Sequence, residues 1–97
     1  MDKKVYIGHV CSSKAGRDKN RYFIIYSIER GGYVTLVDGQ TRKLENPKRK
    51  NIKHINIQNE ILGEIGGKIA TGAYLQNAEI KKALAVFKEA AQINKER

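Results

Sequence analysis

Residues 21–28 constrain the fold more than any other part of the chain, because almost every residue there is apolar or aromatic. A strand with one face in water alternates polar and apolar side chains, whereas a strand buried on both faces does not. This run therefore predicts a central strand that is covered on both of its faces. The segment that follows, from Glu29 to Gly32, predicts a hairpin loop.

Short strand-like runs separated by turn residues surround this central strand. Residues 4–11 precede it, and Gly8 stands where their apolar alternation changes parity, which is typical of a bulge or a sharp bend. Three further runs follow it, at residues 33–37, 41–44 and 52–58. Asp38-Gly39 predicts a two-residue turn that needs positive φ at both positions, and Asn46-Pro47 interrupts the next run. Five short strands with tight turns predict a mainly β fold, a small closed barrel of the SH3-like type.

From Asn59 onwards the sequence changes from strand patterns to helix patterns. Residues 59–71 have apolar residues at helical spacing, although each internal glycine costs a helix about 1 kcal/mol relative to alanine, and Gly72 suits the position just past the end. Residues 77–94 form the clearer helix, with Asn77 as a favourable N-cap. One apolar stripe runs along it, formed by Ile80, Ala83, Leu84, Phe87, Ala90 and Ala91. We expect the stripe to pack on the barrel or on the preceding helix; the alternative is a dimer or partner surface.

These patterns divide the chain into an SH3-like barrel over residues 1–58 and a helical extension over residues 59–97. The net charge of +9 is concentrated in the barrel, where thirteen Lys and Arg face five Asp and Glu; the extension has six against five. A basic module beside a nearly neutral one favours an anionic partner for the barrel, foremost a nucleic-acid backbone. We expect a monomer.

The single cysteine, Cys11, cannot close a disulfide within the chain, and the polar, basic start of the sequence does not resemble a signal peptide. We therefore expect a cytoplasmic protein. No window approaches the roughly eighteen consecutive apolar residues that a membrane-spanning helix needs.

Two groups of basic residues carry most of the charge. The first lies in the loop between the first two predicted strands, where four of the nine residues 13–21 are Lys or Arg, and where Gly16 and Asn20 tolerate positive φ. The second group lies before and within the last predicted strand. In a five-stranded barrel these two connections can lie close together and form one cationic surface. The predicted RNA-binding residues are Lys14, Gly16, Arg17, Lys19 and Arg21 in the first group, and Arg42, Lys43, Lys48, Arg49, Lys50, Lys53 and His54 in the second.

The string Ser13-Lys14-Ala15-Gly16-Arg17-Asp18, with Gly8 before it and the β-rich run after it, resembles the KOW motif of nucleic-acid-binding SH3-like barrels. Together with Asp38-Gly39 and residues 47–54, it is similar to small bacterial KOW-domain RNA-binding proteins, which resemble a KOW-containing large-subunit ribosomal protein family of archaea and eukaryotes. The resemblance covers residues 4–57 and departs from the motif at Asn20, where a second glycine is common. It implies an RNA-binding protein whose partners are ribosomal RNA and ribosome- or translation-associated proteins.

No residue pattern predicts catalysis, a metal site or a cofactor. His9 and Cys11 fall on one face of the first predicted strand, but two ligands are too few for zinc. Cys11 has no base or orienting group in its pattern, and the acids Asp18, Asp38 and Glu45 are scattered in turns. We therefore predict a non-catalytic RNA-binding protein. The alternative is a protein-interaction module of the translation or transcription machinery that uses the barrel edge or the C-terminal helix.

Overall fold

The computed structural model describes residues 4–14 and 16–95. Over these residues the chain forms five strands and two α-helices. In order they are β1 (His9–Ser13), β2 (Tyr22–Glu29), β3 (Tyr33–Val37), β4 (Lys48–Asn51), the 3₁₀ helix η1 (Ile52–His54), β5 (Ile55–Ile61), α1 (Gly63–Thr71) and α2 (Asn77–Lys95). The strands form one antiparallel sheet in the order β4-β3-β2-β1-β5. The fold is therefore strand-rich but mixed, rather than mainly β.

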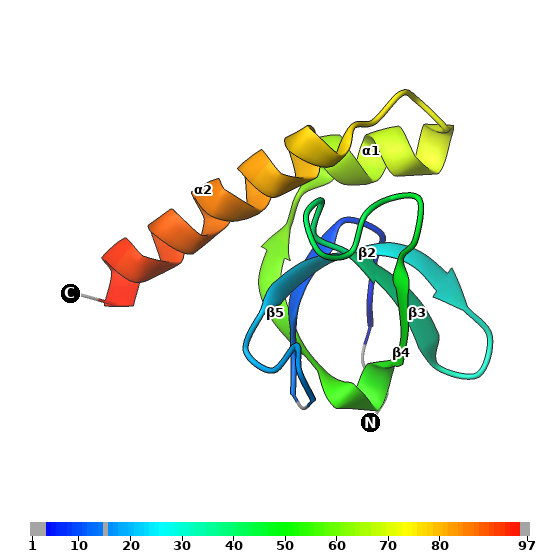
Figure 1. The fold of residues 1–97 in the computed structure, drawn as a ribbon, viewed down its shortest axis with the longest axis horizontal. Coiled ribbons are helices and arrows are strands. Elements are labelled where there is room, and N and C mark those ends of the chain that lie inside the picture. Colours follow the sequence, from blue (N-terminus) through cyan, green and yellow to red (C-terminus); the bar gives the residue numbers. More distant parts are fainter. Residues whose placement is uncertain (1–3, 15, 96–97) are drawn as a thin grey trace.

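The sheet is strongly curled. The evidence is a contact between side chains of two strands that are not neighbours in the sheet. Lys50 on β4 donates a hydrogen bond from Nζ to Oγ of Ser13 on β1, at 2.6 Å, although β3 and β2 lie between them in the sheet. Figure 1 shows the strands curling into a ring-like arrangement, with both helices on one side of it. No ladder between β4 and β5 is found in the described part of the chain, and η1 connects the two strands. The predicted closed barrel is thus observed as a curled sheet with two edges.

The central strand β2 is covered on both faces, as predicted. Phe23, Ile24 and Ile25 are all buried and point alternately to two clusters. The helix-side core contains Val10, Ile24, Val37, Ile65, Ile80 and Leu84. The inner core, on the concave side of the curled sheet, contains Cys11, Phe23, Ile25, Val34, Leu36 and Ile55. The absence of polar alternation in β2 follows from this double burial.

The apolar stripe of α2 packs on the sheet, which is the first of the two expected arrangements. Ile80 and Leu84 are buried in the helix-side core, and Ala83 and Phe87 pack against it. The ring of Phe87 meets Tyr22 of β2 edge-on, with the ring centroids 5.3 Å apart. Among the described residues, no helix is long and apolar enough to cross a membrane.

Helix α1 approaches the chain before β1 through glycines. A Cβ atom on Gly66 would lie 2.8 Å from the carbonyl oxygen of Ile7, and Leu62 donates a backbone hydrogen bond to Gly8 at 2.9 Å. The glycine at position 66, which lowers helix propensity, is therefore what permits this close contact. Gly72 ends α1 in the left-handed conformation, as predicted.

Several element boundaries differ from the sequence prediction. The first strand begins at His9 rather than at residue 4, and the last one begins after η1, which the Asn51 side chain caps by accepting a hydrogen bond from Lys53 N. The lysine-rich segment Lys48–Asn51 is strand β4 rather than a loop. Pairing with β3 gives its backbone a ladder, and this tertiary contact outweighs the weak β-propensity of lysine and asparagine.

Residues 41–44, predicted as a strand, lie in a loop that the Asp38 carboxylate organises. Its Oδ1 accepts hydrogen bonds from the backbone N–H of Gln40 at 2.9 Å and of Arg42 at 2.7 Å, and its Oδ2 accepts one from Thr41 Oγ1 at 2.6 Å. These bonds hold residues 40–42 in a turn and keep them out of a ladder. Asp38 has an ordinary negative φ, so the predicted turn with positive φ at both positions is wrong.

Gly39 lets this loop touch the start of α2. Its φ is +78°, and a Cβ atom there would overlap the carbonyl oxygen of Asn77. The Asn77 side chain strengthens the contact, because its oxygen accepts a hydrogen bond from Leu44 N at 2.8 Å and its amide donates to Glu45 at 2.7 Å. The loop 38–47 and α2 are therefore held together.

We expect Asp38→Asn to lower the free energy of unfolding at neutral pH by about 1.5–3 kcal/mol, the range for hydrogen bonds to a charged group. Burial raises the pKa of Asp38, but hydrogen bonds from Thr41 and from the N–H groups of Arg42 and Gln40 outweigh it and hold the pKa below its ordinary value. The charged carboxylate thus stabilises the fold above its unfolded-state pKa, and this contribution is lost as pH falls through the folded-state pKa. Urea unfolding of both proteins at neutral and acidic pH measures this, and a stability difference that does not shrink on acidification would contradict it.

Candidate nucleic-acid interface

The β1–β2 loop, residues 14–21, is held by its own backbone hydrogen bonds. Asn20 donates to Ser13 O at 3.0 Å, Lys19 to Gly16 O at 3.2 Å, and Arg21 to Asp18 O at 3.0 Å. Gly16 and Asn20 have φ of +83° and +67°, as their sequence positions predict. Asn20 therefore adopts the left-handed conformation that a glycine would otherwise supply.

The four basic side chains of this loop are exposed. Lys14, Arg17, Lys19 and Arg21 all lie at the surface. Within the described residues none of them has an acidic partner within 4.0 Å. The loop's own acid, Asp18, instead pairs with Arg42 at 3.7 Å. The loop thus presents positive charge that no acidic side chain of the described residues pairs with.

Two contacts bring parts of the second basic group beside this loop. Lys14 donates a backbone hydrogen bond to the carbonyl oxygen of His54 at 3.0 Å, which places η1 next to the start of the loop. The ion pair between Asp18 and Arg42 joins the loop to segment 38–47. His54 and its neighbour Lys53 are both exposed. The structure therefore brings together the loop, η1 and the region of Arg42.

Other members of the second group are engaged within the protein. Arg49 forms an ion pair with Glu29 at 2.8 Å, and its guanidinium lies 3.8 Å from the centre of the Tyr33 ring. Lys50 reaches across the curled sheet to Ser13. Both contacts join strands of the sheet, so we assign these two residues a structural role. Lys43 is exposed and Lys48 is half-buried.

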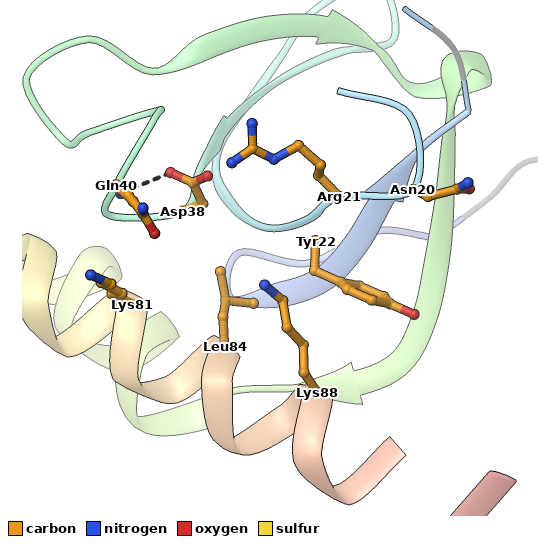
Figure 2. A pocket seen from close by; sticks show the side chains of 8 residues that line it. All are labelled: Asn20, Arg21, Tyr22, Asp38, Gln40, Lys81, Leu84 and Lys88. Carbon is orange, nitrogen blue, oxygen red and sulfur yellow. Dashed lines mark hydrogen bonds between the residues drawn. The ribbon is translucent and has the colours of Figure 1, made fainter. Parts of the chain in front are cut away.

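Helix α2 contributes two lysines to a cavity beside the loop, and the sequence analysis did not predict them. The cavity measures about 330 Å³ and lies between α2, the start of β2 and the turn that follows β3. Figure 2 shows Leu84 and Lys88 pointing from α2 toward Tyr22 and Arg21, whereas Lys81 lies at the end of the cavity near Gln40. The complete lining is Asn20, Arg21, Tyr22, Asp38, Gln40, Lys81, Leu84 and Lys88. The sequence signal that could have identified them is helical spacing. Lys81 lies three residues before the buried Leu84 and Lys88 lies four residues after it, so all three share one side of the helix.

The other side of α2 has the opposite character. A groove of about 530 Å³ lies there, and Ile61 and Val86 remain 43% and 59% exposed in it. Its charged lining consists of Glu60, Glu64, Glu79 and Lys82. Helix α2 thus separates a basic cavity from an acidic and apolar groove.

The cysteine and the histidine of β1, Cys11 and His9, are both buried within the fold. Burial raises the pKa of Cys11 to about 12, although the charge of Lys50 lowers it somewhat, so the thiol stays protonated at neutral pH. The His9 ring is buried, accepts a hydrogen bond from Tyr6 N at 3.3 Å and stacks on the Tyr6 ring. In the described ranges no three His, Cys, Asp or Glu side chains gather as metal ligands would.

The sequence was also compared with known proteins. No protein-family model matches it, and no curated protein matches it either.

Proposed function

We propose that this protein binds RNA and catalyses no reaction. The binding face consists of the β1–β2 loop, the adjoining η1 and the region of Arg42. The observation that carries this proposal is the set of four exposed loop cations without acidic partners in the described part of the chain. Phosphate contacts from Arg and Lys supply most of the affinity in such complexes.

The hydrogen-bonded part of the loop, residues 16–21, supports the proposal. Its backbone bonds hold the described residues in one arrangement before a ligand arrives, which lowers the cost of ordering them on binding. Lys53 extends the positively charged face on one side, and His54 lies beside the loop, since the Lys14 backbone N–H is bonded to the His54 carbonyl oxygen. Arginine matches phosphate through two parallel hydrogen bonds, whereas lysine acts as a mobile point charge. The mixture of arginines and lysines in the loop favours contacts to the RNA backbone, and recognition would then depend on the shape of that backbone.

The resemblance to KOW proteins supports RNA over other polyanions. In this proposal the curled sheet is an SH3-like barrel, and the ligand is a structured RNA, foremost ribosomal RNA, bound in the cytoplasm. The curl shown by the Lys50–Ser13 contact fits a barrel, because strands from opposite parts of the sheet approach each other.

The test is a titration of RNA affinity against salt concentration. If about five phosphates are neutralised, the logarithm of the association constant falls with the logarithm of salt at a slope of about −3 to −4. Fluorescence anisotropy with a labelled fragment of large-subunit ribosomal RNA measures the slope, and a structured RNA of other origin is the comparison. Absence of binding, or binding independent of salt, would refute RNA recognition, whereas equal affinity for both RNAs would refute only the ribosomal preference.

A second candidate function, docking of a protein, is favoured by the groove on the other side of α2. The exposed Ile61 and Val86 lie there among glutamates, so the groove fits a basic amphipathic segment of a partner. Neither Arg17 nor Lys19 lines the groove. A variant in which both become Glu should therefore lose RNA and still bind a synthetic lysine–leucine amphipathic peptide. Failure of the unmodified protein to bind that peptide would reject this candidate.

A further inference from the structure

The cavity of Figure 2 is one end of a longer cleft between α2 and the β1–β2 loop. A second cavity, of about 580 Å³, shares Asn20, Tyr22 and Lys88 with the first and continues along α2 to Gln92. From Lys81 to Gln92 the helix rises about 16 Å. The cleft is thus long enough for more than one nucleotide-sized group. Helix α2 forms one wall, and the end of the β1–β2 loop forms the other.

Positive charge dominates the lining of this cleft. Arg21 comes from the end of the loop, and Lys81 and Lys88 come from α2. None of the three has an acidic partner within 4.0 Å among the residues that the structure describes. The acid in the described lining, Asp38, already accepts hydrogen bonds at both carboxylate oxygens. The lining therefore holds three cations from two separate elements against one carboxylate, and this excess of positive charge favours an anionic ligand.

The remaining lining residues carry side chains of the kinds that bind nucleobases. Tyr22 is half-buried and lines both cavities, and its ring, which meets Phe87 edge-on, is the aromatic group of the lining. Asn20 and Gln40 are exposed and carry amides, which donate and accept hydrogen bonds. Proteins that bind single-stranded RNA use these groups: cations for the phosphates, aromatic rings for stacking and polar groups for the base edges.

The size of the cleft discriminates between paired and unpaired RNA. Cavities of about 300–1,000 Å³ take ligands of the size of a small organic molecule. A base in a duplex is stacked and paired inside the helix, so it reaches Tyr22 only after leaving its partner. An unpaired strand can place its phosphates on the lysines and a base in the cleft without that penalty.

We propose that the cleft between α2 and the β1–β2 loop binds a short stretch of unpaired nucleotides, with phosphates on Arg21, Lys81 and Lys88 and a base beside Tyr22. The ligand class is thus single-stranded or looped RNA, in preference to duplex RNA. This inference rests on the proposed RNA-binding function and adds α2 to the binding face.

The experiment compares two labelled RNAs, a short unstructured strand and the same strand annealed to its complement. Binding to the full chain is followed by fluorescence anisotropy. The variants are Lys81→Glu and Lys88→Glu, and the matched control is Lys82→Glu, the same change on the same helix but in the acidic groove. Circular dichroism melting of each variant confirms that the fold is retained.

We expect the unmodified protein to bind the single strand more tightly than the duplex. Lys81→Glu and Lys88→Glu should each weaken single-strand binding about tenfold or more, since each reverses a charge-assisted contact, while Lys82→Glu changes it less than about threefold. Equal affinity for the two RNAs, or equal effects of all three variants, would overturn the cleft proposal alone. Absence of binding to either RNA by the unmodified protein would overturn the proposed function together with it.

Discussion

Arg17→Glu combined with Lys19→Glu is expected to lower RNA affinity about a hundredfold or more at low salt. Each substitution removes a charge-assisted contact worth about 1.5–3 kcal/mol and places a negative charge against phosphate. The slope of affinity against salt should also flatten by about 1.4, because about 0.7 is lost for each single-strand phosphate contact. Anisotropy titration at several salt concentrations measures both effects. Because both side chains are exposed and lack acidic partners among the described residues, stability should change by no more than about 0.5 kcal/mol each.

The matched control is Arg30→Glu combined with Lys82→Glu, which changes net charge by the same amount. Arg30 lies exposed in the connection between β2 and β3, and Lys82 lines the acidic groove beside α2. If the β1–β2 loop contacts RNA directly, the control should weaken binding only a few-fold through the longer-range field. Equal losses in the two double variants would mean that overall charge attracts RNA and that the loop has no special part.

The parts of the fold that local chemistry determines were predictable from the sequence. The run around Ile24 has no polar alternation because helices cover one face and the inner core covers the other. Gly16 and Asn20 are residue types that tolerate positive φ, and both adopt it. The stripe at Ile80 and Leu84 has helical spacing, and it packs on the sheet. In each case the residue type and its spacing are sufficient to predict the environment.

The features that the sequence did not predict depend on contacts between distant segments. Asp38-Gly39 has the composition of a tight hairpin, yet the Asp38 carboxylate is used for hydrogen bonds to residues 40–42, and Gly39 is pressed against α2. The lysine-rich β4 becomes a strand only because β3 pairs with it. Likewise, Lys81 and Lys88 look like solvated helix positions until the packing of Leu84 places both in the lining of the cavity that Arg21 also lines. Half of the proposed cleft is therefore visible only once α2 is placed on the sheet.

Ile80→Ala is expected to destabilise the whole protein by about 2–5 kcal/mol, the range for truncating a buried Leu or Ile to Ala. Ile80 is fully buried in the helix-side core, where it packs with residues of β1, β2 and β3. For a domain of this size each kcal/mol lowers the melting temperature by about 4–8 °C, so the shift should exceed about 8 °C. Val86→Ala is the control, since Val86 lies on the same helix but is 59% exposed, and it should change stability by no more than about 0.5 kcal/mol.

The shape of the unfolding transition then shows whether α2 and the sheet act as one unit. Because Ile80 and Ile24 share one core, helix and sheet signals should be lost together in Ile80→Ala, at a single lower temperature. This coupling matters for binding, since the cavity that Arg21, Lys81 and Lys88 line together exists only while α2 stays on the sheet. Far-ultraviolet circular dichroism, which reports the helix, and tyrosine fluorescence, which reports five tyrosines of which three lie on β2 and β3, measure the two signals. A helix that melts well before the sheet would contradict a shared core and would make α2 a separately folding attachment.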